Sequence, residues 1–224
     1  MTSSQSNVRP EIYQFNLGKF KVTNILDGYF HRADMHPFAA TNAPPSEIEK
    51  VAKDHHLPYP KLEHNFVPTI IETDDSLIAF DPGFGKRAPA PSAGWYNDLL
   101  EKTGYNVDQV THVVVSHGHP DHIANLTTDD APTFKNAEIV ISRAEYEFWS
   151  GDAPIPEFRG ATRKMFREVV VPLADRCRFI EPDASIVGGL TALNASGHSA
   201  GHLAFHVESE GKELMILSDT IAHY

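Results

Sequence analysis

The sequence is poor in cysteine, in long apolar runs and in positive charge near its N-terminus. Its one cysteine, Cys177, has no partner for an internal disulfide. No apolar stretch approaches the ~20 residues needed to span a bilayer. The segment Met1–Asn7 lacks both the cationic start and the apolar run of a secretory signal. We therefore expect no disulfide, no membrane association and a cytoplasmic location.

Positive charge is scarce along the whole chain, where 19 Lys and Arg stand against 30 Asp and Glu for a net charge of -11. A negative field repels nucleic-acid phosphates, and no basic stripe overrides it. Nucleic acid is therefore not an expected partner. The length of 224 residues and the hydrophobic content of 41% allow one sizeable core. These values predict a single domain over residues 1–224.

The N-terminal part, residues 1–65, differs in character from the rest. Lys19–Leu26 alternates enough to predict a strand, whereas Gly28–His64 carries many prolines and aromatics around a short helical candidate at Pro45–Asp54. We expect an irregular flap over a site, or a contact surface that could serve a homodimer. Four aromatic side chains of this part could line an apolar pocket or simply pack against the sheet: Tyr29, Phe30, Phe38 and Tyr59. Residues 66–224 are expected to form the core that carries the site.

Patterns typical of strands and helices alternate beyond this segment. The Asp74-Asp75 pair predicts a hairpin between two β-rich segments, Ser142 with Glu145 predicts a capping box, and Gly104 is placed to end a helix. The predicted strands are Phe66–Thr73, Ser76–Phe80, Thr111–Ser116, Glu138–Ile141, Arg178–Ile180, Leu190–Asn194, His202–Glu208 and Glu213–Ser218, and the helices are Trp95–Lys102, Ser142–Trp149 and Glu157–Val170. This mixture predicts sheets covered by helices, an α/β or α+β layered domain.

The stretch Ser116-His-Gly-His-Pro-Asp-His122 carries four residues of metal-ligand type directly after an apolar strand. His117 and His119 can converge on one ion where the backbone turns, and Asp121 and His122 then face a neighbouring position. Gly118 permits the tight bend and Pro120 stiffens it. Imidazole and carboxylate together suit zinc, iron, manganese or cobalt. A loop of solvated histidines is the alternative, but it gives no reason for four such residues in six positions.

Two later features extend the pattern. In Ser196-Gly-His-Ser-Ala-Gly-His202, His198 and His202 lie in a glycine-bracketed turn between two predicted strands. Asp219 comes at the end of the apolar run Leu214–Leu217, after Ser218. Each alone is more typical of a structural histidine or a turn aspartate. In this order after the first cluster, they suggest loops that meet at one edge of a sheet.

The order SHGHPDH, SGHSAGH, SDT resembles the metallo-β-lactamase superfamily, whose HxHxDH signature the first motif matches letter for letter. The resemblance runs from about Phe66 to the end and implies an αββα sandwich, two mixed sheets flanked by helices. It implies two divalent metal ions, most simply zinc, with these ligands: His117, His119 and His198 on the first, Asp121 and His122 on the second, and Asp219 on both. It also implies that Asp81, in FDPG, orients ligands by hydrogen bonds, and that His202 lies behind them.

Within the superfamily, the early irregular segment and the FDPGFG turn look most like the branch of methyl parathion hydrolase-like enzymes and quorum-quenching lactonases. That branch implies a hydrolase that uses a metal-bound hydroxide on a lactone, ester or phosphotriester bond of a small molecule, with proton transfer by Asp121. Three alternatives stay open: a thioester hydrolase, a mononuclear-iron persulfide dioxygenase, and a metal-binding fragment without catalysis.

The chain departs from the pattern after Asp219. Members with two metals draw one more histidine from some tens of residues further on, whereas here only His223 follows, close to Tyr224. The closing strands and helix of the family are not found either. The expectation is therefore a truncated version of a longer protein, in which the second metal site lacks a ligand.

Overall fold

The computed structural model describes residues 10–36 and 42–221. Phe38 and His223, both named above, lie outside these ranges. The described strands and helices are β1 (Ile12–Leu17), β2 (Phe20–Ile25), β3 (Gly28–Arg32), α1 (Pro45–Asp54), β4 (Leu62–Phe66), β5 (Thr69–Glu72), β6 (Leu77–Phe80), α2 (Tyr96–Lys102), β7 (His112–Val115), α3 (Pro120–Ile123), β8 (Thr127–Thr128), β9 (Ala131–Pro132), β10 (Glu138–Ser142), α4 (Arg143–Ser150), α5 (Gly160–Val169), β11 (Cys177–Ile180), β12 (Ser185–Val187), β13 (Leu190–Asn194), β14 (Leu203–Ser209) and β15 (Lys212–Ile216). Six short 3-10 helices join them: η1 (Gly85–Arg87), η2 (Val107–Gln109), η3 (Ala124–Leu126), η4 (Glu157–Arg159), η5 (Val171–Arg176) and η6 (Ser218–Thr220).

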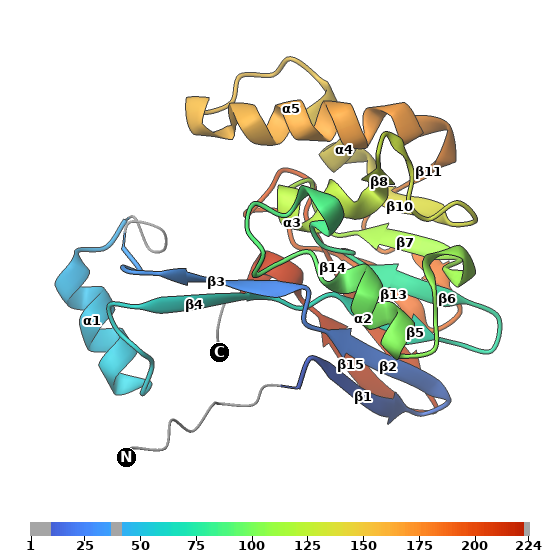
Figure 1. Cartoon of the computed structure of the whole chain (residues 1–224), viewed down its shortest axis with the longest axis horizontal. Helices are drawn as coiled ribbons and strands as arrows, with labels where there is room; N and C mark the ends of the chain where they lie inside the picture. The colour runs from blue at the N-terminus through green and yellow to red at the C-terminus, as the bar shows by residue number, and fades with distance from the viewer. Residues whose placement is uncertain (1–9, 37–41, 222–224) are drawn as a thin grey trace.

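The two largest sheets are a mixed sheet of seven strands and an antiparallel sheet of four. The seven-stranded sheet has the order β1-β2-β5-β6-β7-β10-β11, and the smaller sheet has the order β12-β13-β14-β15. Pairing is antiparallel from β1 to β6 and parallel from β6 to β11. The prediction of a mixed α/β layered fold is confirmed, and the described layers are helices, large sheet and small sheet (Figure 1).

The side chains of β7 point alternately to the two faces of the large sheet, so this strand packs against the layers on both sides. Val114 points into the core between the two sheets, with Phe80 and Phe205, whose rings lie 5.1 Å apart. Val113 and Val115 point to the other face, where helices α2, α4 and α5 pack. All three valines are fully buried, as a period of two requires in a strand covered on both sides.

The predicted start of a strand at Phe66 is wrong. Phe66 ends β4, and Pro68 separates it from β5. Proline has no N–H to donate, so the pairing partner changes at this point: β4 pairs with β3, and β5 pairs with β2. The Asp74-Asp75 turn does join β5 to β6 as expected, and Gly104 follows α2 with a φ of 92°.

The segment Gly28–His64 is more regular than predicted, because β3 and β4 form an antiparallel ribbon that carries α1. Figure 1 shows this ribbon projecting from the sheets, with α1 at its far end. Aromatic packing secures its base: the ring of Phe30 lies 5.0 Å from that of Phe66, and Tyr29 packs edge-on against Trp95. Plain packing is thus the better description of Tyr29 and Phe30.

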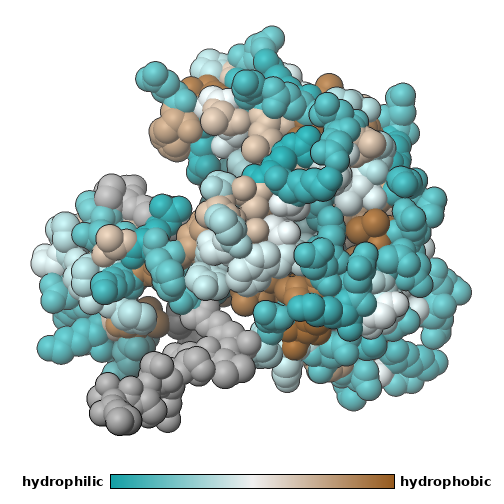
Figure 2. All heavy atoms as spheres, viewed as in Figure 1, coloured by the Kyte–Doolittle hydropathy of each residue, from teal (hydrophilic) through white to brown (hydrophobic). Residues whose placement is uncertain are grey.

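The visible face of the molecule is mostly hydrophilic, with apolar side chains in scattered patches (Figure 2). Among the described residues, none of the helices combines the length and the apolar character that crossing a membrane requires.

Candidate metal centre

The residues of the first motif are presented by the end of β7 and the start of α3. The buried strand ends at Val115, and Pro120 occupies the first turn of α3, where a missing N–H costs nothing. His117 and His119 therefore lie on the loop, and Asp121 and His122 on the first helical turn. His198 comes from the β13–β14 loop and Asp219 from η6, after β15.

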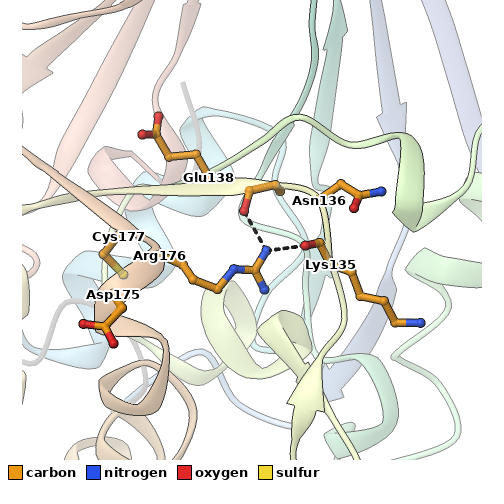
Figure 3. A pocket seen from close by; sticks show the side chains of 7 residues that line it. Lys135, Asn136, Glu138, Asp175, Arg176 and Cys177 are labelled. Atoms are coloured by element: carbon orange, nitrogen blue, oxygen red, sulfur yellow. Dashed lines mark hydrogen bonds between the residues drawn. The ribbon is translucent and has the colours of Figure 1, made fainter.

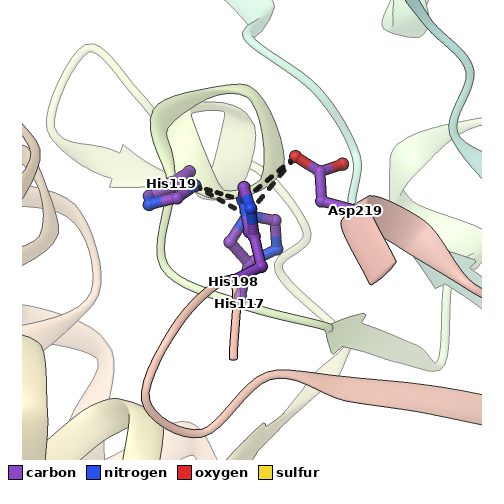
Figure 4. Close-up of side chains that lie close together, drawn as sticks. All are labelled: His117, His119, His198 and Asp219. Atoms are coloured by element: carbon purple, nitrogen blue, oxygen red, sulfur yellow. Dashed lines mark hydrogen bonds and ion pairs between the residues drawn. The ribbon is translucent and has the colours of Figure 1, made fainter. Parts of the chain in front are cut away.

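The first donor group consists of His117, His119, His198 and Asp219 (Figure 4). His119 Nδ1 lies 2.9 Å from His117 Nε2 and 3.0 Å from His198 Nε2. Asp219 Oδ2 lies 3.3 Å from His198 Nε2 and 3.8 Å from His117 Nε2. Three ring nitrogens and one carboxylate oxygen thus converge on a common point, with the ligand types of a zinc site.

The second donor group consists of Asp121, His122 and Asp219. His122 Nε2 lies 3.3 Å from Asp121 Oδ2 and 3.5 Å from Asp219 Oδ1. Asp219 thereby divides its two carboxylate oxygens, Oδ2 toward the first group and Oδ1 toward the second. Within residues 10–36 and 42–221, no other histidine joins this second group.

Burial keeps the imidazoles of His117 and His119 neutral. It lowers the pKa of His117 well below the usual range, with the neighbouring rings of His122 and His119 adding to the effect. Burial also lowers the pKa of His119 to about 3, and the positive charge of Arg159 is the next cause. Neutral imidazole is the form that binds a metal ion, so these histidines are ready at neutral pH.

The second group has an excess of negative charge. Burial by itself lowers the pKa of His122, but Asp121 and Asp81 outweigh it and hold that pKa well above the usual range. Both ring nitrogens of His122 are buried and make no hydrogen bond, although Asp81, Asp121 and Asp219 all approach within 3.5 Å. One imidazole among three carboxylates is an environment that a divalent cation would neutralise, so the donor set fits a metal ion.

Asp81 lies behind both groups, and its carboxylate bonds to residues that touch a member of each. Its Oδ1 accepts from the backbone N–H of Ser116 at 2.7 Å, and its Oδ2 accepts from Ser116 Oγ at 2.7 Å and from Ser218 Oγ at 3.1 Å. Oδ2 also lies 3.1 Å from His122 Nδ1. Ser116 Oγ in turn lies 3.0 Å from His117 Nδ1, so this one carboxylate reaches a member of each group.

His202 is fully buried and does not belong to either donor group. Its ring lies 4.8 Å from that of His117, and its Nδ1 lies 3.2 Å from the carbonyl oxygen of Ala195. His202 thus packs behind the first group, while His198 supplies the donor atom that enters it.

Sequence reasoning missed Glu145, and the predicted capping box at this position is wrong. Ser142 precedes α4 without a side-chain cap bond. Glu145 is fully buried and accepts instead from Gly118 N, Gly201 N, Ser199 Oγ and Trp149 Nε1. The S-x-x-E spacing is a local signal, and these donors belong to distant loops that no local signal reveals.

A cavity of about 320 Å³ opens beside the first donor group. It combines the two ligands His119 and His198 with an apolar wall and one cation, and its lining includes Phe148, Trp149, Ile155, Pro156 and Arg159. Within the part of the chain that the structure describes, Arg159 has no ion-pair partner, and its guanidinium lies over the ring of Phe158. Burial lowers the pKa of His64 in β4, and the charges of Asp121 and Asp219 oppose this effect, so the ribbon passes near the second donor group.

A second cavity, of about 390 Å³, lies at the start of β10 and β11 and contains no residue of the predicted centre (Figure 3). The guanidinium of Arg176 crosses it and donates to the carbonyl oxygens of Phe134, Lys135 and Ala137, each at 2.8 Å. These bonds tie the loop before β10 to η5, which is a structural role.

Comparison with known proteins identifies relatives of this chain. The sequence profile of the Metallo-beta-lactamase superfamily matches residues 68–223. An N-acyl homoserine lactonase of Bacillus cereus is 29% identical over 120 residues, which cover 54% of this chain and 42% of that protein. An N-acyl homoserine lactonase of Bacillus thuringiensis is 27% identical over 168 residues, which cover 66% of this chain and 60% of that protein. The chain thus spans between 42% and 60% of the length of these relatives.

Solved structures share the fold at low sequence identity. AidC, a dizinc quorum-quenching lactonase, superimposes with a TM-score of 0.79 at 22% identity, over 91% of this chain and 72% of that one. The hydrolase AbOPH of the beta lactamase superfamily superimposes with a TM-score of 0.80 at 22% identity, over 92% of this chain and 73% of that one.

Proposed function

The chain belongs to the metallo-beta-lactamase superfamily, and from this premise we propose that it is a zinc-dependent hydrolase that opens the lactone ring of a small molecule. N-acyl homoserine lactones are the first substrates to test, because relatives at 27–29% identity carry that activity in their names. Esters and phosphotriesters are the next classes.

The observation that carries the proposal is the division of Asp219 between two donor groups. Oδ2 faces three imidazoles and Oδ1 faces His122. A carboxylate that offers one oxygen to each group is suited to bridge two cations. Divalent ions bound there would activate water and polarise the substrate carbonyl, which is the chemistry that ring opening needs.

The residues of this chain would divide the remaining work. His117, His119 and His198 would hold the first ion, His122 and Asp121 the second, and Asp219 both. Asp121 is the proposed proton carrier: it would take a proton from the attacking water and pass it to the alkoxide that ring opening leaves. The pKa of Asp121 is low, because His122 outweighs the effect of burial, so its carboxylate is ionised at neutral pH before the reaction begins.

The cavity beside the first group supplies the substrate side of the proposal. Phe148, Trp149 and Ile155 form an apolar wall next to His119 and His198. An acyl chain could lie along this wall while the ring carbonyl faces the donor groups, because apolar lining with few polar groups is typical of a small-molecule site.

Metal analysis combined with an activity panel tests the proposal. Purified protein should hold about two ions of zinc per chain and cleave a lactone faster than a phosphotriester, an aryl ester or a thioester. Folded His117→Ala and Asp219→Ala proteins that retain the full rate would refute it. One iron per chain with oxygen consumption would favour the persulfide dioxygenase instead, and bound metal without turnover would favour a non-catalytic role.

Two further predictions from the sequence stay predictions. A homodimer would be seen as a doubled mass in light scattering, and the ribbon β3–β4 with α1 is the surface proposed for it. A cytoplasmic location would be seen by fractionation of cells that express the protein.

A further inference from the structure

We propose that Glu145 is a positioning residue that sets the spacing between the two loops of the first donor group. The loop His117–His119 and the loop His198–His202 come from opposite sheets, and their backbones are joined at one end only, where the N–H of Leu203 donates to the carbonyl oxygen of Ser116 at 3.0 Å. One carboxylate lies between them and binds both. This inference rests on the proposed metal centre, and it does not depend on the substrate.

The hydrogen bonds of Glu145 come from backbone groups next to the proposed metal ligands. Oε1 accepts from the N–H of Gly118, the residue between His117 and His119, at 2.7 Å. Oε2 accepts from the N–H of Gly201, three residues after His198, also at 2.7 Å. The carboxylate therefore spans the two loops, and a change in either bond would move a ligand-bearing backbone.

Two side chains complete the shell around this carboxylate. Ser199 Oγ and Trp149 Nε1 both donate to Oε1, the latter at 2.7 Å. The indole of Trp149 also packs edge-on against the ring of His119, with centroids 5.7 Å apart. Glu145 thereby acts on His119 through the backbone and through a side chain.

Only an acceptor with two oxygens satisfies this shell. Four donors surround the side chain, and an ionised carboxylate accepts at both oxygens and donates nothing. A glutamine would turn its amide N–H toward a donor, either Gly201 N or the three groups at Oε1. The charge has no cationic partner in the described ranges, so hydrogen bonds from the two loops compensate its burial.

The glycines of the two loops fit this close approach. A Cβ on Gly201 would lie 2.2 Å from Glu145 N, and a Cβ on Gly118 would lie 2.5 Å from Trp149 Cδ1. Both loops are therefore pressed against α4, which leaves little freedom in their separation once Glu145 is in place.

Within the part of the chain that the structure describes, none of the hydrogen bonds of Glu145 reaches Asp121, His122 or Asp219. Asp121 and His122 lie on α3, and Asp81 lies behind His122 at 3.1 Å. A role confined to positioning the first group thus predicts an uneven effect, in which one metal site weakens and the other does not. A general loss of stability would weaken both.

Metal affinity of the whole 224-residue chain tests the proposal. We would titrate metal-free protein with Zn²⁺ against a chromophoric chelator, and with Co²⁺ while recording its visible spectrum. The Glu145→Gln variant should bind the first ion about 10- to 100-fold more weakly, as is typical when a group that orients a ligand is removed, and its Co²⁺ spectrum should shift. The second ion should bind as in the unchanged protein.

Glu147→Gln is the matched control, because it makes the same change on the same helix at an exposed position. It should leave both affinities unchanged. Ser199→Ala is a milder variant for the case in which Glu145→Gln does not fold: it removes one donor and keeps the charge, and it should weaken the first ion several-fold while sparing the second.

The outcomes separate this inference from the proposed function. Unchanged protein that binds no metal would refute the metal centre itself. Metal binding by the unchanged protein, with equal first-ion affinity and spectrum in folded Glu145→Gln, would overturn the role of Glu145 alone. An equal loss at both sites would overturn it too, and if Glu145→Gln does not fold, an unaffected first site in Ser199→Ala would do the same.

Discussion

The two halves of the candidate metal centre are supported by different carboxylates on different elements. Glu145, on α4, binds the backbone beside His119 and His198. Asp81, after β6, holds Ser116 and lies against His122. Each buried acid lies behind ligands from other segments, and neither is itself a member of a donor group. The histidines of one six-residue motif thus face two positions, and a different buried carboxylate lies behind each.

The largest expected effect comes from removing the residue that joins the halves. Asp219→Ala takes one oxygen from each donor group, so both ions should bind weakly and lactone turnover should fall to background. Metal content after dialysis and the initial rate measure this. Asp175→Ala, in η5, is a control that should keep both. A variant that keeps two tightly bound ions would show that the halves do not depend on Asp219.

A smaller effect should come from Asp81→Asn, and it should fall mainly on the second ion, because Asp81 lies directly against His122 but reaches His117 only through Ser116 Oγ. Asp81 has a φ of 48°, which asparagine adopts readily, so the backbone should stay in place. Loss of charge beside His122 should weaken the second ion by about 10- to 100-fold, measured by chelator competition. If the first ion is lost more than the second, the assignment of Asp81 to the second half is wrong.

The cavity lies on the side of the first half, so its wall should affect substrate and not metal. Ile155→Ala removes apolar surface from that wall. At ~0.8 kcal/mol per buried methylene, kcat/KM should fall on the order of fourfold for each methylene of the acyl chain that the wall no longer covers. The loss should be larger for a long-chain acyl lactone than for a short one, with both metal affinities unchanged. Equal losses for all chain lengths would place the acyl group elsewhere.

The smallest effect is expected far from both halves, at Cys177. Burial raises the pKa of this thiol from 9.0 to about 11. The folded state then holds a proton that the unfolded state releases between pH 9 and 11, so the free energy of unfolding should decrease as the pH rises through this window. Cys177→Ser should flatten that part of the curve in denaturant titrations and leave metal binding unchanged. Alkylation of the folded protein should accelerate about tenfold per pH unit, because only the thiolate reacts. Rapid labelling at pH 7 would contradict the raised pKa.

Much of the fold could be predicted from the sequence, because the strands beside the centre carry strong local signals. Two of these strands consist of apolar residues, the valines before Ser116 and the segment Leu214–Leu217 before Asp219. Each is followed by residues of metal-ligand type, so both the strands and their ends could be predicted. The first strand, Ile12–Leu17, was missed because only one of its six residues is buried and polar residues interrupt the pattern. The β3–β4 ribbon was missed because its partners are about 35 residues apart and pair through the backbone, which sequence pattern does not report.

The candidate site, like the fold, could be predicted from the sequence only in part. The sequence alone determined the types and spacing of the donors, from His117 to His122, because imidazole and carboxylate chemistry is local to each residue. Only the tertiary structure decided that Asp219 turns one oxygen to each group, and that Glu145 serves two distant loops where a capping box was predicted. Those arrangements depend on segments that lie 50 to 100 residues apart and meet through packing of the two sheets with α4. A hydrogen bond between residues so far apart in the sequence produces no periodic pattern of residue types.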